Sequence, residues 1–167
     1  GVVVFDPTAQ WTGFLRKCQE GFMLKRYQYF DMKAGEARSF NGRIRTIKNP
    51  REFIDIKEYM RPGEITIFNI SKMTPQQIEI FTINVIQQIF RSNLEEAHQL
   101  QNLVIFDEVH RLLPKFGGSG KGFVQLERGA REFRKWGVGL VLISQVLSDF
   151  VGEVKANIST EIQVTTR

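Results

Sequence analysis

The chain of 167 residues is 42% hydrophobic and carries a formal net charge of +5 at pH 7, which suits one domain with a buried core and an anionic partner such as nucleic acid. Its single cysteine, Cys18, excludes an internal disulfide, and no apolar run approaches the length of a membrane span. Because no signal peptide is present either, we expect a cytoplasmic protein without a membrane segment.

The first 49 residues predict one strand, one short helix and an irregular stretch. Val2–Phe5 is a run of apolar, mostly β-branched residues that Asp6-Pro7 ends, so it is predicted to be a buried strand. Residues 9–20 place apolar side chains at helical spacing. Residues 21–49 are expected to form an irregular insertion with a hairpin at Asn41-Gly42, because that dipeptide tolerates the positive φ of a tight turn.

The next segment predicts a helix, a strand and a longer helix. Asn49-Pro50 is typical of a helix start, and Pro62-Gly63 is typical of a helix end, so a helix is predicted between them. Glu64–Ile70 is rich in β-branched residues and is expected to be a strand. Thr74-Pro75-Gln76-Gln77 reads as a capping box with proline at the first helical position, which starts a helix that is expected to continue to about Ala97.

Four apolar residues, Leu103–Phe106, then run directly into two carboxylates, Asp107 and Glu108. A short apolar run of this kind suits a strand buried on both faces in a parallel sheet, and ligands of open α/β sheets collect at the carboxyl ends of such strands. Successive side chains of a strand point in opposite directions, so the two acids are expected to have separate tasks. One carboxylate that holds Mg²⁺ and one that orients the attacking water form the Walker B pattern of nucleotide hydrolysis.

A glycine-rich loop over residues 114–122 follows, and it does not match the phosphate-binding motif G-x-x-x-x-G-K-[ST]. The first glycine of that motif would fall on Lys115, and the position after Lys121 is Gly122 instead of a hydroxyl residue. Between Arg111 and Lys135 the chain has seven basic residues and two acidic ones. We therefore expect this segment to contact a phosphate backbone through Lys115, Lys121 and Arg128, with a solvated helix face as the alternative.

The last part of the chain predicts a basic helix and a further buried strand. Phe123–Trp136 has an apolar face with Arg131 directed away from it and Arg134 near its border. Gly139–Ser144 is expected to be a strand that places Gln145 beside the two carboxylates if the strands are neighbours. A helix over 147–157 and a strand over 161–165 complete the prediction.

Strands that alternate with helices predict an α/β fold with a doubly wound, mainly parallel sheet flanked by helices. The order of landmarks resembles the RecA-like core of the HerA/FtsK superfamily of ring-forming DNA-pumping ATPases. It is closest to the HerA-like branch that is shared with conjugation and type IV secretion ATPases. The segments that carry the resemblance are Val2–Pro7, Leu103–Pro114 and Ala130–Gln145.

This resemblance implies an ATP hydrolase that uses ATP and Mg²⁺. Asp107 becomes the acid on the Mg²⁺ side, Glu108 the acid that activates water, and Gln145 the sensor amide. Arg131 and Arg134 become candidates for an arginine that acts in the site of the neighbouring subunit. The phosphate-binding loop of the family precedes the first strand seen here, so residues 1–167 are expected to be one incomplete ATPase domain that is inactive alone.

The resemblance also implies partners. We expect a DNA translocase or helicase that acts on double-stranded DNA as a homo-oligomeric ring, with a hexamer as the expected size. A partner nuclease, or a conjugation or secretion machinery, is a further expectation.

Two other functions fit parts of the sequence. Asp107-Glu108-Val109-His110 also looks like the DExH box of helicases with two RecA-like lobes. Alternatively, the chain is a nucleic-acid-binding or assembly module without catalysis. His110 is expected to orient or pack rather than to bind a metal, because His98 is the only other histidine.

Overall fold

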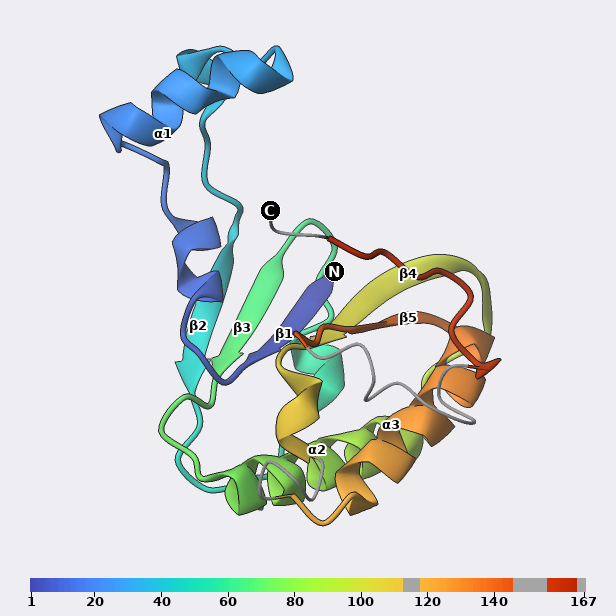
Figure 1. Ribbon diagram of the computed structural model, residues 1–167. Helices are drawn as coiled ribbons and strands as arrows, with labels where there is room; N and C mark the ends of the chain where they lie inside the picture. Colours follow the sequence, from blue (N-terminus) through green and yellow to red (C-terminus); the bar gives the residue numbers. More distant parts are fainter. Residues whose placement is uncertain (113–117, 146–155, 165–167) are drawn as a thin grey trace.

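A computed structural model describes residues 1–112, 118–145 and 156–164 as a parallel sheet with helices packed on it (Figure 1). The strands are β1 (Val2–Asp6), β2 (Gly42–Thr46), β3 (Ile65–Asn69), β4 (Ala97–Phe106) and β5 (Trp136–Leu142). The α-helices are α1 (Gly21–Arg26), α2 (Pro75–Arg91) and α3 (Lys121–Glu132). Short 3₁₀ helices are η1 (Trp11–Leu15), η2 (Tyr27–Phe30), η3 (Ala34–Glu36), η4 (Ile56–Glu58), η5 (Val109–Leu112) and η7 (Phe133–Lys135).

The five strands are all parallel and lie in the order β2-β3-β1-β4-β5. β1 is central, with Val2 opposite Ile65 of β3 on one side and Leu103 of β4 on the other. The predicted α/β class and parallel sheet are therefore confirmed, and the arrangement is consistent with a RecA-like core. Of the described helices, none combines the length and the apolar character that a bilayer crossing requires.

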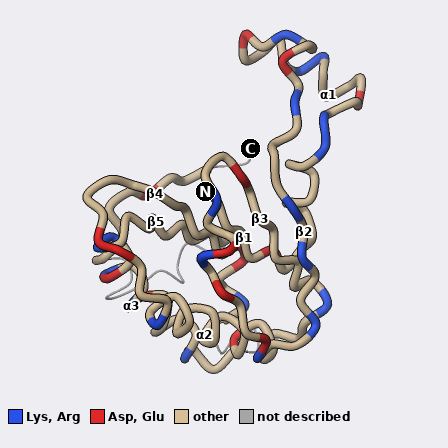
Figure 2. Tube along the Cα trace, turned by 180° about the vertical axis from the view of Figure 1, so that it is seen from behind, with Lys and Arg blue, Asp and Glu red and all other residues tan. Residues whose placement is uncertain are grey.

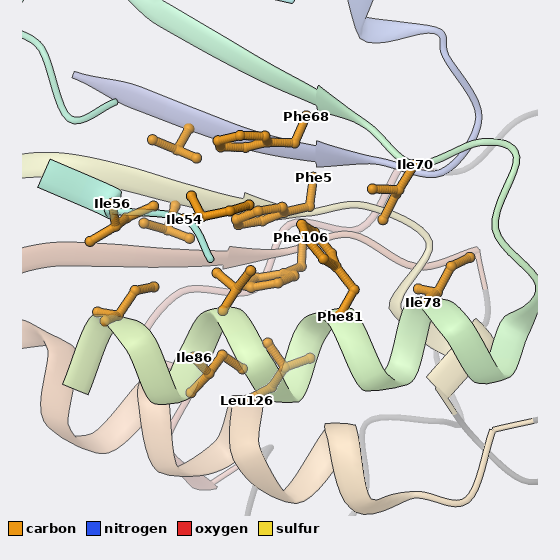
Figure 3. Packing of buried hydrophobic residues seen from close by; sticks show 14 of the residues in the cluster. Phe5, Ile54, Ile56, Phe68, Ile70, Ile78, Phe81, Ile86, Phe106 and Leu126 are labelled. Atoms are coloured by element: carbon orange, nitrogen blue, oxygen red, sulfur yellow. The ribbon is translucent and has the colours of Figure 1, made fainter. Parts of the chain in front are cut away.

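One face of the sheet carries the main core, against which α2 and α3 pack (Figure 3). Phe5 of β1 stacks on Phe106 of β4 with ring centroids 4.6 Å apart and on Phe68 of β3 at 5.3 Å. Phe81 of α2 meets the Phe5 ring edge-on at 5.6 Å. These four rings are at most 3% exposed, so they fix α2 to the centre of the sheet.

The opposite face of the sheet has a smaller core. Its buried members are Val4, Ile65, Ile67 and Ile105. Trp11 and Leu15 of η1 cover part of this cluster. The two faces of the sheet are thus covered differently, because both long helices of the described residues lie on the face with the main core.

The capping box at the start of α2 is confirmed. The Thr74 hydroxyl accepts a hydrogen bond from the Gln77 N–H (3.3 Å), and the Gln77 side chain accepts one from the Thr74 N–H (2.9 Å). The helix ends at Arg91 rather than near Ala97, where β4 already begins. The predicted strand at 103–106 is therefore the second half of a ten-residue strand.

The predicted hairpin at Asn41-Gly42 is wrong, because β2 starts at Gly42 and runs parallel to β3. A Cβ atom on Gly42 would lie 2.0 Å from the Ile65 carbonyl oxygen. The glycine therefore permits the close approach of two strands instead of a turn. The stretch 21–49, predicted to be an irregular insertion, contains α1, η2, η3 and the edge strand β2.

The helix predicted between Pro50 and Arg61 is also wrong, since only the short η4 forms there. Side chains of α2 bind this backbone instead. The amides of Asn84 and Gln88 donate to the Glu52 carbonyl (2.8 and 3.3 Å), and the Gln88 oxygen accepts from the Ile54 N–H (2.6 Å). These tertiary hydrogen bonds replace the helical ones.

Smaller differences between predicted and observed elements occur elsewhere in the chain. The helix predicted over 9–20 is reduced to η1, and residues 161–164 are not in a strand. The predicted helix at 147–157 falls almost entirely outside the described residues. α3 and η7 together confirm the helix predicted at 123–136, but β5 already begins at Trp136.

Residues 14–40, here called the arm, project from the body beyond β2 (Figure 1). The arm leaves and rejoins the body at one point, where the Phe40 N–H donates to the Phe14 carbonyl (2.9 Å) and the two rings lie 5.7 Å apart. No residue of η1, α1, η2 or η3 is buried. The arm therefore has no core of its own.

Candidate functional site

Acidic and amide side chains collect where β1, β4 and β5 end. Asp6 is the last residue of β1, Asp107 and Glu108 follow β4, and Gln145 follows β5. β4 lies between β1 and β5, with Phe106 opposite Phe5 and Leu142. Three neighbouring parallel strands thus deliver these residues to one edge of the sheet, which is the ordinary place for a ligand site in an α/β fold.

Glu108 has a backbone conformation that the sequence did not predict. β4 ends at Phe106, so Asp107 and Glu108 do not alternate along a strand as expected. Glu108 is left-handed, with φ +52°, and its N–H donates to Asp107 Oδ1 (2.9 Å). A non-glycine residue in this region is uncommon and carries strain, which directs the two carboxylates apart by a turn rather than by strand alternation.

The Glu108 carboxylate is held from two sides. Gln145 Nε2 donates a hydrogen bond to Glu108 Oε1 (2.7 Å), and His110 Nε2 lies 3.2 Å from Glu108 Oε2. The Glu108 side chain is 11% exposed. The expectation that Gln145 lies beside the carboxylates is confirmed, and His110 has the orienting contact that was expected of it.

Asp107 faces the opposite direction, toward η1. Trp11 Nε1 donates a hydrogen bond to Asp107 Oδ2 (3.0 Å). Burial raises the pKa of Asp107 above its ordinary value, and the negative charges of Glu108 and Asp6 add to this rise, although the hydrogen bonds from Trp11 and from the Glu108 N–H partly offset it. The site is therefore electronegative and would gain from a cation.

Asp6 is a functional candidate that sequence reasoning did not select. It is fully buried and accepts hydrogen bonds from the Thr8 N–H, the Thr8 hydroxyl and the Trp11 N–H, all at 3.0 Å. These bonds fix the turn that places Trp11 against Asp107. The signal was present in the sequence, because Asp6-Pro7 ends a buried strand in the same way as Asp107-Glu108.

The described residues fit Mg²⁺ only as a one-carboxylate site. No three acidic, histidine or cysteine side chains among residues 1–112, 118–145 and 156–164 come close enough to hold a metal ion. Mg²⁺ commonly keeps several waters and uses one or two carboxylates together with phosphate oxygens, and Asp107 suits that role. The cavity beneath Glu108, lined among others by Thr82, has a volume of about 10 Å³, which is room for one water at most.

Glu79 of α2 organises the loop that follows the site, and it too was missed. Its buried carboxylate accepts hydrogen bonds from the Ser119 N–H (2.8 Å), the Ser119 hydroxyl (3.0 Å) and the Gly122 N–H (3.1 Å). Burial raises the pKa of Glu79, but the hydrogen bonds from Gly122 and Ser119 outweigh burial and lower it. A glutamate in the second turn of a helix gives no sequence signal for this role, because its hydrogen-bond partners lie forty residues later in the chain.

The basic residues of α3 do not join this site. Arg131 pairs with Glu127 (3.5 Å), and Arg128 pairs with Glu132 (3.4 Å) and lies over the Phe90 ring (4.3 Å). Arg134, predicted to border the buried face, is exposed.

Arg131 and Arg134 lie near the start of β5, whereas Glu108 and Gln145 lie at its end. Seven residues of strand, about 20 Å, separate the two ends. Lys121 is the exposed first residue of α3, and Lys115 falls outside the described residues.

No family model, curated protein or solved structure matches this chain. The likeness to HerA-like ATPases thus rests on the motifs of the sequence. Any function has to be argued from the geometry at the carboxyl edge.

Proposed function

We propose that this chain carries the acidic half of an ATP-hydrolysing site in a ring-forming, HerA-type DNA motor. The observation that supports this most is the Glu108 carboxylate held between Gln145 Nε2 (2.7 Å) and His110 Nε2 (3.2 Å), next to Asp107 at the ends of neighbouring parallel strands. A carboxylate fixed in this way suits the orientation of a water molecule.

Each residue has a separate task in this proposal. Glu108 orients the attacking water and takes its proton, Gln145 holds the Glu108 carboxylate in place, and Asp107 holds a hydrated Mg²⁺. Bound ATP with its Mg²⁺ supplies the γ-phosphate and the charge that offsets the two acids. The 167 residues contain no G-x-x-x-x-G-K-[ST] motif, so the lysine that neutralises the phosphates would come from sequence outside them.

ATP hydrolysis by the full-length protein tests this proposal. Glu108→Gln should lower turnover by at least about 100-fold while ATP remains bound, because the change removes the base and leaves Asp107 intact. Asp107→Ala should instead weaken Mg²⁺-dependent ATP binding. Glu96→Gln, which makes the same change at an exposed glutamate, is the control. Full turnover in Glu108→Gln would refute the role assigned to Glu108. No ATP hydrolysis by the wild type would instead favour a nucleic-acid-binding or assembly module without catalysis.

The ring and its arginine are the second part of the proposal. Arg131 and Arg134 are exposed at the far end of β5, which suits contact with a site in another subunit more than with Glu108 of the same chain. An arginine supplied in this way can be worth about 10³ to 10⁵ in turnover. The same proposal includes double-stranded DNA as the substrate, a hexamer as the size of the ring, and a nuclease or a conjugation or secretion machinery as the partner.

A further inference from the structure

A second basic region of the chain lies outside α3. Residues 14–51 include ten basic residues and three acidic ones, an excess larger than the net charge of +5 of the whole chain. Figure 2 shows Lys and Arg along the arm and along β2. A polyanion is the natural partner of such a surface, because each phosphate contact releases bound counterions.

The same region exposes flat, apolar side chains. The most exposed rings of the arm are Tyr29 (77%), Phe30 (75%), Phe22 (61%) and Phe40 (60%). Met23 and Met32 add further exposed apolar surface. Isolated apolar side chains on a surface are ordinary, but so many exposed apolar side chains on one short segment without a core are typical of an interaction site.

Basic side chains continue from the arm onto β2, where their positions are fixed. The guanidinium groups of Arg43 and Arg45 lie over the Tyr59 ring at 4.9 and 5.5 Å. Arg43 also donates to the Glu58 carbonyl (2.7 Å), and Arg45 pairs with Glu52. The basic surface formed by the arm and β2 therefore has a rigid part on the sheet edge and a loosely packed part on the arm.

We propose that the arm and the edge of β2 bind single-stranded nucleic acid, with exposed rings stacking on bases and basic side chains contacting phosphates. Charge complementarity selects a polyanion, and the rings select one whose bases are free to stack, which a duplex does not offer. α1 has only six residues, whereas helices that lie on membrane surfaces are generally longer, so a lipid surface fits less well. This surface is separate from the Glu108 site and does not depend on its function.

The test is the anisotropy of a labelled oligothymidylate bound to the full chain without nucleotide, compared with the same sequence as a duplex. Tyr29→Ala with Phe30→Ala should weaken binding of the single strand by about tenfold or more and change duplex binding little. Lys25→Ala with Arg26→Ala should weaken both and reduce the salt slope by up to about 0.7 per lost phosphate contact on the single strand. Lys121→Ala with Arg128→Ala on α3 compares the arm with the other basic segment, and Lys72→Ala with Arg91→Ala, at exposed residues outside both segments, is the matched control.

Three outcomes would overturn the proposal. The first is a larger loss of single-strand affinity from the α3 pair than from the arm pairs. The second is equal affinity for duplex and single strand that the ring substitutions leave unchanged. The third is binding to phosphatidylserine vesicles without binding to oligothymidylate. Thermal unfolding of each variant provides the folding check. The substituted residues are all exposed, so their removal should leave the body intact.

Discussion

The carboxyl edge of the sheet and the arm differ in how their side chains are held. At the edge, Asp6, Asp107 and Glu108 each have hydrogen-bond partners within 3.0 Å from other residues of the body. On the arm, rings such as Tyr29 and Phe30 are three-quarters exposed. Fixed side chains suit chemistry, which needs preset geometry, whereas loosely held side chains suit a partner that supplies the missing contacts.

The two regions are joined by rings. Trp11, which donates to Asp107, stacks on Phe14 with centroids 5.1 Å apart, and Phe14 contacts Phe40 at 5.7 Å. The root of the arm therefore packs on the indole ring that donates to the candidate Mg²⁺ carboxylate. The following predictions test how independent the two regions are.

The largest expected effect contrasts the core with the arm. Phe81→Ala, at a fully buried ring, should lower the free energy of unfolding by about 3–5 kcal/mol because it leaves a cavity under Phe5. Phe30→Ala on the arm should change it by less than about 0.5 kcal/mol. Urea unfolding measures both. A large loss from Phe30→Ala would show that the arm is part of the cooperative body.

Glu79→Gln is expected to lower the free energy of unfolding by about 1–3 kcal/mol, because N–H donors of the 119–122 loop lose a charged acceptor. The effect depends on pH. Since the folded pKa of Glu79 is lowered, its contribution is complete above the ordinary glutamate pKa and is lost as the pH falls through the folded pKa. Wild type and variant should therefore converge in stability at acid pH, and the exposed Glu96→Gln should show no such trend.

Trp11→Phe should lower the free energy of unfolding by about 1–2 kcal/mol, because the indole hydrogen bond to Asp107 is lost. That bond lowers the pKa of Asp107, so its removal should raise the pKa further. Carboxyl NMR titration measures the shift. Trp136→Phe at the start of β5 is the control and should leave the Asp107 pKa unchanged; an equal shift in both variants would disprove the direct contact.

The smallest expected effect on stability is that of Arg131→Ala or Arg134→Ala, below about 0.5 kcal/mol, because both side chains are exposed. Turnover of the full-length ring separates a surface role from a role in the neighbouring site. Mixing an arginine variant with Glu108→Gln should restore part of the hydrolysis if the arginine acts across an interface. Full activity of each arginine variant alone would exclude that role.

The sequence predicted those parts of the fold that depend on local patterns. The apolar runs of β1, β3 and β4 and the capping box of α2 were recognisable because neighbouring residues alone determine them. The position of Gln145 beside Glu108 also followed, because the carboxyl ends of parallel neighbours share one edge.

What the sequence did not predict depends on distant residues. Asn41-Gly42 reads as a turn, but the approach of Ile65 makes Gly42 the start of an edge strand. The helix after Pro50 is replaced by hydrogen bonds from Asn84 and Gln88. The anchoring role of Glu79 likewise requires a loop that the chain reaches forty residues later.

The two edges of the sheet differ in how they resist addition of another strand. β2 presents Arg43 and Arg45, and charged side chains on an edge strand discourage pairing with a foreign strand. β5, which ends the sheet on the other side among the described residues, is Trp-Gly-Val-Gly-Leu-Val-Leu and has no charge. Its backbone groups are thus the less protected ones, and a strand added there would run next to the segment that ends at Gln145.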